Sequence, residues 1–296
     1  MKTALERDCD YLLEKRLQTL DSDLHSRFTD TVFVLPYALD QYQRLFPEYT
    51  DHSVLHCMNV VNFCNILIGP EQIEKMNAYE IYVLLMSCYL HDIGMAITAK
   101  DYQEFKDELG AKDYFQKWPN RNVPDFVRDY HNEFSGLFIK KYAEFLEIPS
   151  PELTFAIVQV ARGHRRVNLF DHEEYPEQLQ LADGNTVSLP YLAALIRLAD
   201  EIDVVADRNP KLLYDIEALT DSNQIFHHRM HEAVPDIQIF PDGFLLEVKT
   251  DDEALQISIE KMAAKMRATL DICRAVAEER SSYHISQKWV ELNVQP

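Results

Sequence analysis

The sequence predicts a mainly α-helical protein that ends in a small α+β part. In the first two thirds of the chain, apolar residues recur every three or four positions, which is the spacing of an amphipathic helix. In the last third they alternate on either side of Asp-Gly turns, as they do in β-hairpins. Of the 296 residues, 47% are hydrophobic and only 7 are glycine. This composition is typical of a folded globular chain with a substantial core.

Leucines at helical spacing predict a first helix over residues 3–28. Gly69-Pro70 and Gly94 are expected to end the next two helices. Pro190 suits the first turn of a later helix, because the N–H that proline lacks would be unpaired there anyway. The expected helices after the first one cover about 52–68, 78–91, 100–109, 124–147, 151–163 and 190–205.

Two hairpins are predicted in the last third of the chain. The first covers about 178–189 and turns at Asp183-Gly184, and the second turns at 241–243. A long helix over about 252–280 and a closing strand over 289–294 follow. The predicted organisation is an N-terminal helix at 1–30, a helical domain at 31–230 with the first hairpin as an insertion, and a C-terminal α+β appendage at 231–296.

The charge of the chain restricts its partners. There are 29 basic and 49 acidic residues, which gives a formal charge of −20. A protein that binds long nucleic acids or anionic membranes normally carries an excess of lysine and arginine, because neutralised phosphates supply most of its affinity. The composition therefore disfavours both and favours a small anionic substrate.

The cysteines indicate a reducing compartment. Five are scattered along the chain without a CxxC pair, so a disulfide framework is not expected. The first residues are charged and amphipathic, unlike a signal peptide. The most apolar stretch, residues 81–90, is too short to span a bilayer. We expect a soluble, cytoplasmic protein.

The pair His91-Asp92 at the end of an apolar helix is the central candidate for metal binding. A buried carboxylate is costly unless a cation or a hydrogen bond satisfies it. A divalent metal ion would do so, although a plain helix cap explains an isolated His-Asp pair as well. Upstream, His52 and His56 share one helix face, and downstream Asp200 lies on an apolar helix, with Asp203 three residues on. Such nitrogen and oxygen donors suit Mn, Fe, Co, Ni or Zn, in one or two ions, with Mg as a further option.

The ordered set His56, His91-Asp92 and Asp200 resembles the HD superfamily of metal-dependent phosphohydrolases. Val60 follows His56 by four residues, as in the first helix of that family. The strings LHDIG and RLADEID are similar to the family's two other motifs. The TDH…H opening and the YLHDIGM string resemble bacterial HD domains found alone or beside chaperone-type ATPase domains.

The resemblance covers about residues 45–206 and implies a helical HD bundle. It also implies a metal site made of His56, His91, Asp92 and Asp200. Alignment on the valine favours His56 over His52 as the ligand and leaves His52 near the mouth of the site, where it would contact substrate.

Further histidines and arginines are candidates for the same site. In many HD proteins extra histidines hold a second metal or contact phosphate, which suggests these roles for His131 and His164. Alternatively, His131 is a core histidine and His164 a surface cap. The guanidinium groups of Arg162, Arg165 and Arg166 would anchor phosphate, or would pair with nearby acids in a solvated loop. For the group His227, His228 and His231, a surface or packing role is expected.

The resemblance implies hydrolysis of a phosphoester or phosphoanhydride bond by a metal-activated water. Asp92, His131 and His164 are the catalytic candidates, and a small nucleotide-type molecule is the expected substrate. The alternative is a non-catalytic nucleotide-sensing or regulatory HD module that acts with a protein partner. The C-terminal part would serve as a substrate lid or as the contact of a homodimer.

Overall fold

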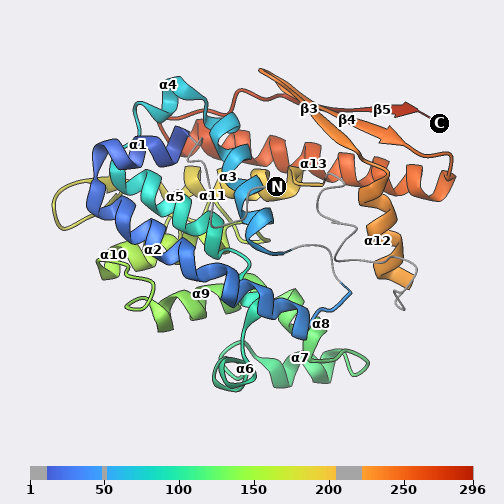
Figure 1. Cartoon of the computed structure of the whole chain (residues 1–296), viewed down its shortest axis with the longest axis horizontal. Helices are drawn as coiled ribbons and strands as arrows, with labels where there is room; N and C mark the ends of the chain where they lie inside the picture. Colours follow the sequence, from blue (N-terminus) through green and yellow to red (C-terminus); the bar gives the residue numbers. More distant parts are fainter. Residues whose placement is uncertain (1–11, 49–51, 205–221, 296) are drawn as a thin grey trace.

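The structure is a computed structural model that describes residues 12–48, 52–204 and 222–295. The described residues are mainly helical with a small strand-containing part near the C-terminus, which confirms the predicted fold class (Figure 1). The helices are α1 (Leu12–Leu20), α2 (Ser22–Leu39), α3 (Val54–Ile68), α4 (Pro70–Ile73), α5 (Ala78–Leu90), α6 (Ala99–Phe105), α7 (Ala111–Lys117), α8 (Val123–Asp129), α9 (His131–Tyr142), α10 (Pro151–Arg162), α11 (Leu189–Ile202), α12 (Ser222–Glu232) and α13 (Glu253–Arg280). Short 3-10 helices are η1 (Asp40–Arg44) and η2 (Ile93–Ala96), and the strands are β1 (Leu179–Gln180), β2 (Thr186–Val187), β3 (Asp236–Phe240), β4 (Gly243–Lys249) and β5 (Trp289–Gln295).

Helix α5 lies at the centre of the helical bundle. Every residue from Glu80 to Leu90 is buried, so this helix has no solvated face. A helix that is apolar all round must be surrounded by other elements, and α5 packs against α1, α2, α3, α10 and α11. Asn77 and Glu80 form a capping box at its start. The buried helix delivers its C-terminal neighbours, His91 and Asp92, to the interior of the protein.

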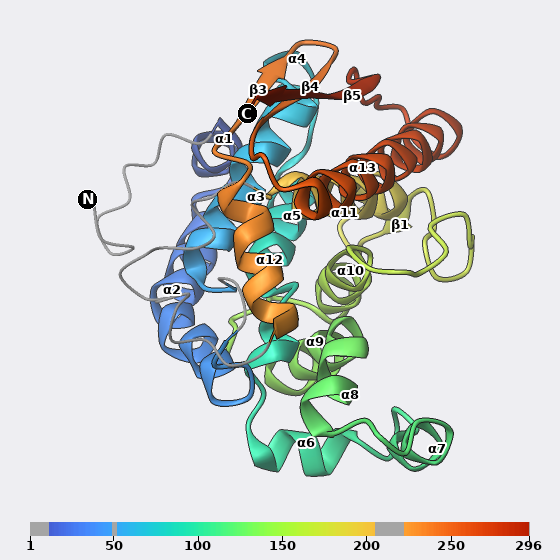
Figure 2. The same ribbon diagram turned by 90° about the vertical axis from the view of Figure 1, so that its right-hand side faces the viewer.

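The C-terminal part docks on α11 through the long helix α13. Strands β3 and β4 form an antiparallel hairpin, and β5 pairs in parallel with β4 after the chain has crossed through α13. Phe244, Leu246 and Val248 alternate along β4 and are fully buried. Figure 2 shows the sheet and α13 at one end of the molecule and α6 to α8 at the other. Because α13 packs on α11, the C-terminal part lies next to the helix that carries Asp200.

Several predicted elements differ from the observed ones. The expected first helix is divided at Asp21, whose side chain caps α2 by accepting the N–H groups of Asp23 and Leu24. Its residues 3–11 lie outside the described residues. The expected helix at 124–147 is divided at Tyr130, where the backbone leaves helical geometry (φ −118°, ψ 15°).

The predicted domain boundaries at residues 30 and 230 fall inside α2 and α12. Helix α2 continues because its apolar residues keep helical spacing as far as Leu39, and it packs on α5. The N-terminal helices are therefore part of the bundle, while the division into domains itself stays a prediction. The 178–189 segment forms the expected hairpin, β1 with β2.

Among the described residues, no single helix is long and apolar enough to cross a membrane. One helix pair, Ala78–Ala96 with Ala99–Phe105, is long and apolar enough when taken together, although a bend of 94° separates its halves.

Candidate metal centre

The six predicted metal ligands come together at one place in the helical bundle. His56 lies on α3, His91 and Asp92 follow α5, and Asp200 lies on α11. His131 begins α9, and His164 lies just beyond α10. The four histidines and Asp92 are at most 7% exposed, and the side chain of Asp200 is 24% exposed.

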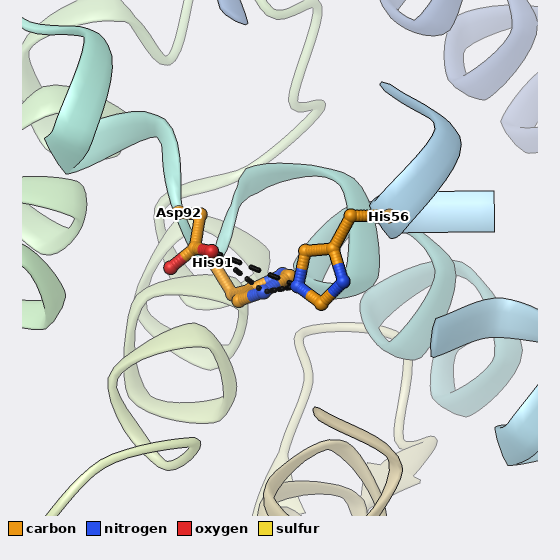
Figure 3. Close-up of side chains that lie close together, drawn as sticks. All are labelled: His56, His91 and Asp92. Atoms are coloured by element: carbon orange, nitrogen blue, oxygen red, sulfur yellow. Dashed lines mark hydrogen bonds and ion pairs between the residues drawn. The ribbon is translucent and has the colours of Figure 1, made fainter. Parts of the chain in front are cut away.

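Their ligand atoms form two groups that share Asp92. In the first group, His56 Nε2 lies 3.1 Å from His91 Nε2, which lies 3.4 Å from Asp92 Oδ2 (Figure 3). His56 Nε2 also lies 3.2 Å from Asp200 Oδ1. In the second, Asp92 Oδ1 lies 3.3 Å from His131 Nε2 and 3.6 Å from His164 Nε2. The two oxygens of Asp92 thus face different histidine pairs.

The tautomer of each histidine is determined by the partner of its other ring nitrogen. The Nδ1–H groups of His91, His131 and His164 donate to carbonyl oxygens three residues earlier, at 2.9, 2.6 and 2.6 Å. These carbonyls belong to the last turns of helices, where carbonyl oxygens lack the usual i+4 backbone partner. His56 Nδ1–H donates to Asp203 Oδ2 at 2.6 Å. The Nε2 atom of each histidine therefore faces the centre, and in the neutral ring it carries the lone pair that a metal ion would take.

The short distances between the paired nitrogens favour a bound cation. His56 Nε2 and His91 Nε2 are 3.1 Å apart, and His131 Nε2 and His164 Nε2 are 2.9 Å apart. Neutral rings with Nδ1–H place two lone pairs at these distances, and two such lone pairs repel each other. An ion between them, neutralised by carboxylates, removes the repulsion and gives the nitrogen and oxygen donor set of a transition metal. The residues therefore fit one or two divalent ions.

The protonation states agree with metal binding. Burial raises the pKa of Asp92, but the adjacent imidazoles of His91 and His131 outweigh it and hold that pKa well below its usual range. Burial likewise raises the pKa of Asp200, but the neighbouring histidines His56 and His91 outweigh it and hold that pKa well below its usual range. Burial, followed by the nearby His91 and His131, lowers the pKa of His164. Charged carboxylates and neutral imidazoles are the forms that coordinate a metal.

Asp203 is a functional candidate that the sequence did not assign. It is fully buried at the end of α11, accepts the Nδ1–H of His56, and accepts a second hydrogen bond from Asn59 Nδ2 at 3.1 Å. A carboxylate behind a histidine fixes the ring and increases its basicity as a ligand. The three-residue offset from Asp200 was the available signal, but it does not say which aspartate faces the metal.

Replacement of Asp203 by asparagine is expected to weaken metal binding by about 10–100-fold, because the neutral amide no longer fixes the ring or increases its basicity. Metal affinity would be measured by competition with a chelating dye, beside the exposed control Asp107→Asn. Equal affinities in the two variants would contradict this role of Asp203.

A cavity of about 580 Å³ opens beside the metal centre. Its walls carry Asp92, His131 and Asp200 from the centre, and four cationic residues, Arg128, Arg165, Lys261 and Lys265. His52 also lines this cavity, and the substrate contact expected for it stays a prediction.

The arginine cluster divides into residues with different surroundings. Arg165 lines the cavity. Arg162 does not, since its guanidinium donates two hydrogen bonds to the carboxylate of Glu133, at 2.8 and 3.0 Å. Arg166 is exposed outside the cavity lining. Only Arg165 of the three therefore lines the cavity, and the substrate contacts expected for Arg162, Arg165 and Arg166 stay predictions.

The histidines of α12 have packing partners. His228 is fully buried and its Nε2 lies 3.0 Å from the carbonyl oxygen of Glu48, while His231 Nδ1 lies 2.7 Å from that of Val204. His227 and His231 also line the cavity. That these histidines line the cavity was not predicted from the sequence, because α12 has no clear apolar stripe and was not expected as a helix.

Comparison with known families finds a match to the family model described as HD-CE, which covers residues 46–282 of the chain. The match includes every residue of both ligand groups and extends through α13. No curated protein matches the chain.

Proposed function

The chain belongs to the HD-CE family, an HD-type domain, and on that premise we propose that it is a metal-dependent phosphohydrolase acting on a nucleotide-type substrate. The observation that carries the proposal is the position of Asp92 between two pairs of histidines, with one carboxylate oxygen facing each pair. A site built only for structural stability would close its ligand shell, whereas Asp92, His131 and Asp200 border an open cavity.

The roles of the residues follow from their chemistry. His56, His91, Asp92 and Asp200 would hold one ion, and Asp92, His131 and His164 a second. A bound divalent ion would activate water and polarise a phosphoryl oxygen. Because the N–H groups of His131 and His164 already donate to carbonyls, these histidines suit metal coordination better than donation to phosphate.

The cationic cavity wall supports an anionic substrate. Arg165 follows His164 directly and Arg128 precedes His131 by three residues, and both arginines line the same cavity as His131. A guanidinium binds phosphoryl oxygens in two-pronged fashion and compensates charge that develops during transfer. In a chain with a formal charge of −20, arginines and lysines gathered at one cavity favour a small phosphate compound.

The test is metal analysis followed by turnover. Protein purified without chelators is expected to contain about two transition-metal ions per chain, the capacity of the two ligand groups. His131→Ala should retain about one of them, and Asp200→Ala should lose metal from the first group. His284→Ala, which removes an exposed histidine, serves as the control.

A panel of nucleotides with Mn²⁺, Co²⁺ and Ni²⁺ then tests hydrolysis. Phosphate release that requires metal and is lost in Asp200→Ala would support the proposal. Full metal content without release from any nucleotide would replace it by the regulatory alternative, in which the domain senses a nucleotide and acts through a protein partner.

A further inference from the structure

We propose that the α13 wall of the cavity is a second anion subsite, in which Lys261 binds a phosphate that is not cleaved. The substrate class is then a nucleotide with at least two linked phosphates. The inference rests on the proposed function only in placing the reacting phosphate at the metal ligands.

The α13 residues that line the cavity form one row. Ser258, Lys261, Met262 and Lys265 are spaced by three, four and seven residues, so they share one face of the helix. At the rise of an α-helix, Lys261 and Lys265 are about 6 Å apart along the axis. Figure 2 shows α13 next to α12 and α11, which carry the neighbouring parts of the cavity wall. The row therefore leads from the metal centre toward α12.

The two lysines of the row have different surroundings. Lys265 Nζ lies 2.7 Å from Glu201 Oε2, and Glu201 directly follows Asp200, so the charge of Lys265 is balanced beside the metal centre. Within the described part of the chain, the Lys261 side chain has no hydrogen bond or ion pair. Lys261 is thus a cation at the cavity wall that is available to an incoming anion.

The cations of the cavity come from two parts of the chain. Arg128 and Arg165 lie close in the chain to the metal-site histidines, whereas Lys261 lies on α13 in the C-terminal part. A single phosphate at the metal ligands would use the arginines and leave Lys261 without an anion. A diphosphate or longer group has a second anionic centre, with which Lys261 can form a charge-assisted hydrogen bond.

An apolar part of the same cavity suits a nucleobase. Phe226 and Met230 are four residues apart on α12, and both line the cavity together with Met262. Thioether and aromatic side chains pack well against the face of a planar ring. The combination of this apolar part with the lysine row favours a nucleoside polyphosphate or a dinucleotide over inorganic pyrophosphate.

Binding measurements separate this inference from the proposed function. Metal-loaded protein would be titrated calorimetrically with AMP, with the non-hydrolysable α,β-methylene analogue of ADP, and with pyrophosphate. The diphosphate analogue is expected to bind about tenfold tighter than AMP, and Lys261→Gln should abolish most of this preference, since one charged contact corresponds to about that factor. Lys249→Gln, which neutralises an exposed lysine outside the cavity, should keep it.

Equal binding of the diphosphate analogue and AMP, a preference that survives Lys261→Gln, or no nucleotide binding would overturn the subsite. Pyrophosphate bound as tightly as the diphosphate analogue would overturn the nucleobase contact. A Lys261-dependent preference in a protein that hydrolyses no nucleotide would support the subsite and contradict only the proposed hydrolase activity.

Discussion

Asp92→Ala is expected to abolish both metal binding and phosphohydrolase activity. Among the described residues, Asp92 is the ligand shared by both groups, with Oδ2 toward His56 and His91 and Oδ1 toward His131 and His164. The variant would lose this shared carboxylate, and the four histidines would face one another without it. Because alanine supplies neither charge nor oxygen, turnover should fall by at least about 10³-fold, the scale of losing a major electrostatic contribution to catalysis.

The measurement combines elemental analysis with nucleotide hydrolysis by the metal-loaded protein. Asp107→Ala removes an exposed carboxylate far from the cavity lining and is the control. Circular dichroism would verify that the variant keeps its helices. Activity retained by an Asp92→Ala protein that contains no metal would refute the proposed mechanism.

The sequence predicted the boundaries of the buried helices well, because a helix needs apolar residues wherever it packs against other elements. The boundaries expected for the helices at 52–68 and 78–91 lie within two residues of α3 and α5. Proline and glycine were reliable at the ends of such helices, as Pro151 and Pro190 lie in the first turns of α10 and α11. The break at Tyr130 was not predicted, because no glycine or proline marks it.

The site was predictable in its ligand types and not in its hydrogen bonds. His131 and His164 gave no local sign of facing Asp92, and only the family resemblance suggested them. Asp203 and Arg162 show the limit of residue type as a guide. A buried aspartate behind His56 and an arginine held by Glu133 depend on contacts between residues that are far apart in the sequence.

Gly94→Ala is expected to destabilise the protein and separate the two ligand groups. A Cβ at this position would collide with the carbonyl oxygen of His131 and approach Ser135 N to 2.7 Å. Both are backbone atoms of α9, so neither can move away as a side chain would. Overpacking of this kind costs about 3 kcal/mol.

The close approach of Gly94 to Ser135 also positions the metal ligands. Gly94 N–H donates to Ser135 Oγ at 2.9 Å, and that hydroxyl donates to the carbonyl oxygen of His91 at 2.6 Å. These bonds hold the segment after α5 against α9. Displacement of α9 would carry His131 away from Asp92, so the second ion should be lost before the first.

The expected result is a melting temperature lowered by roughly 6–12 °C, at about 2–4 °C per kcal/mol for a chain of this size, together with loss of about one metal ion. Gly136→Ala is the matched control, since its Cβ would meet only side-chain atoms of Arg162 and Val158, at 3.1–3.3 Å. Alanine also favours a helix over glycine by about 1 kcal/mol, which offsets part of that crowding. Equal melting temperatures for the two variants would mean that η2 and α9 tolerate separation and that their close approach does not hold the metal centre together.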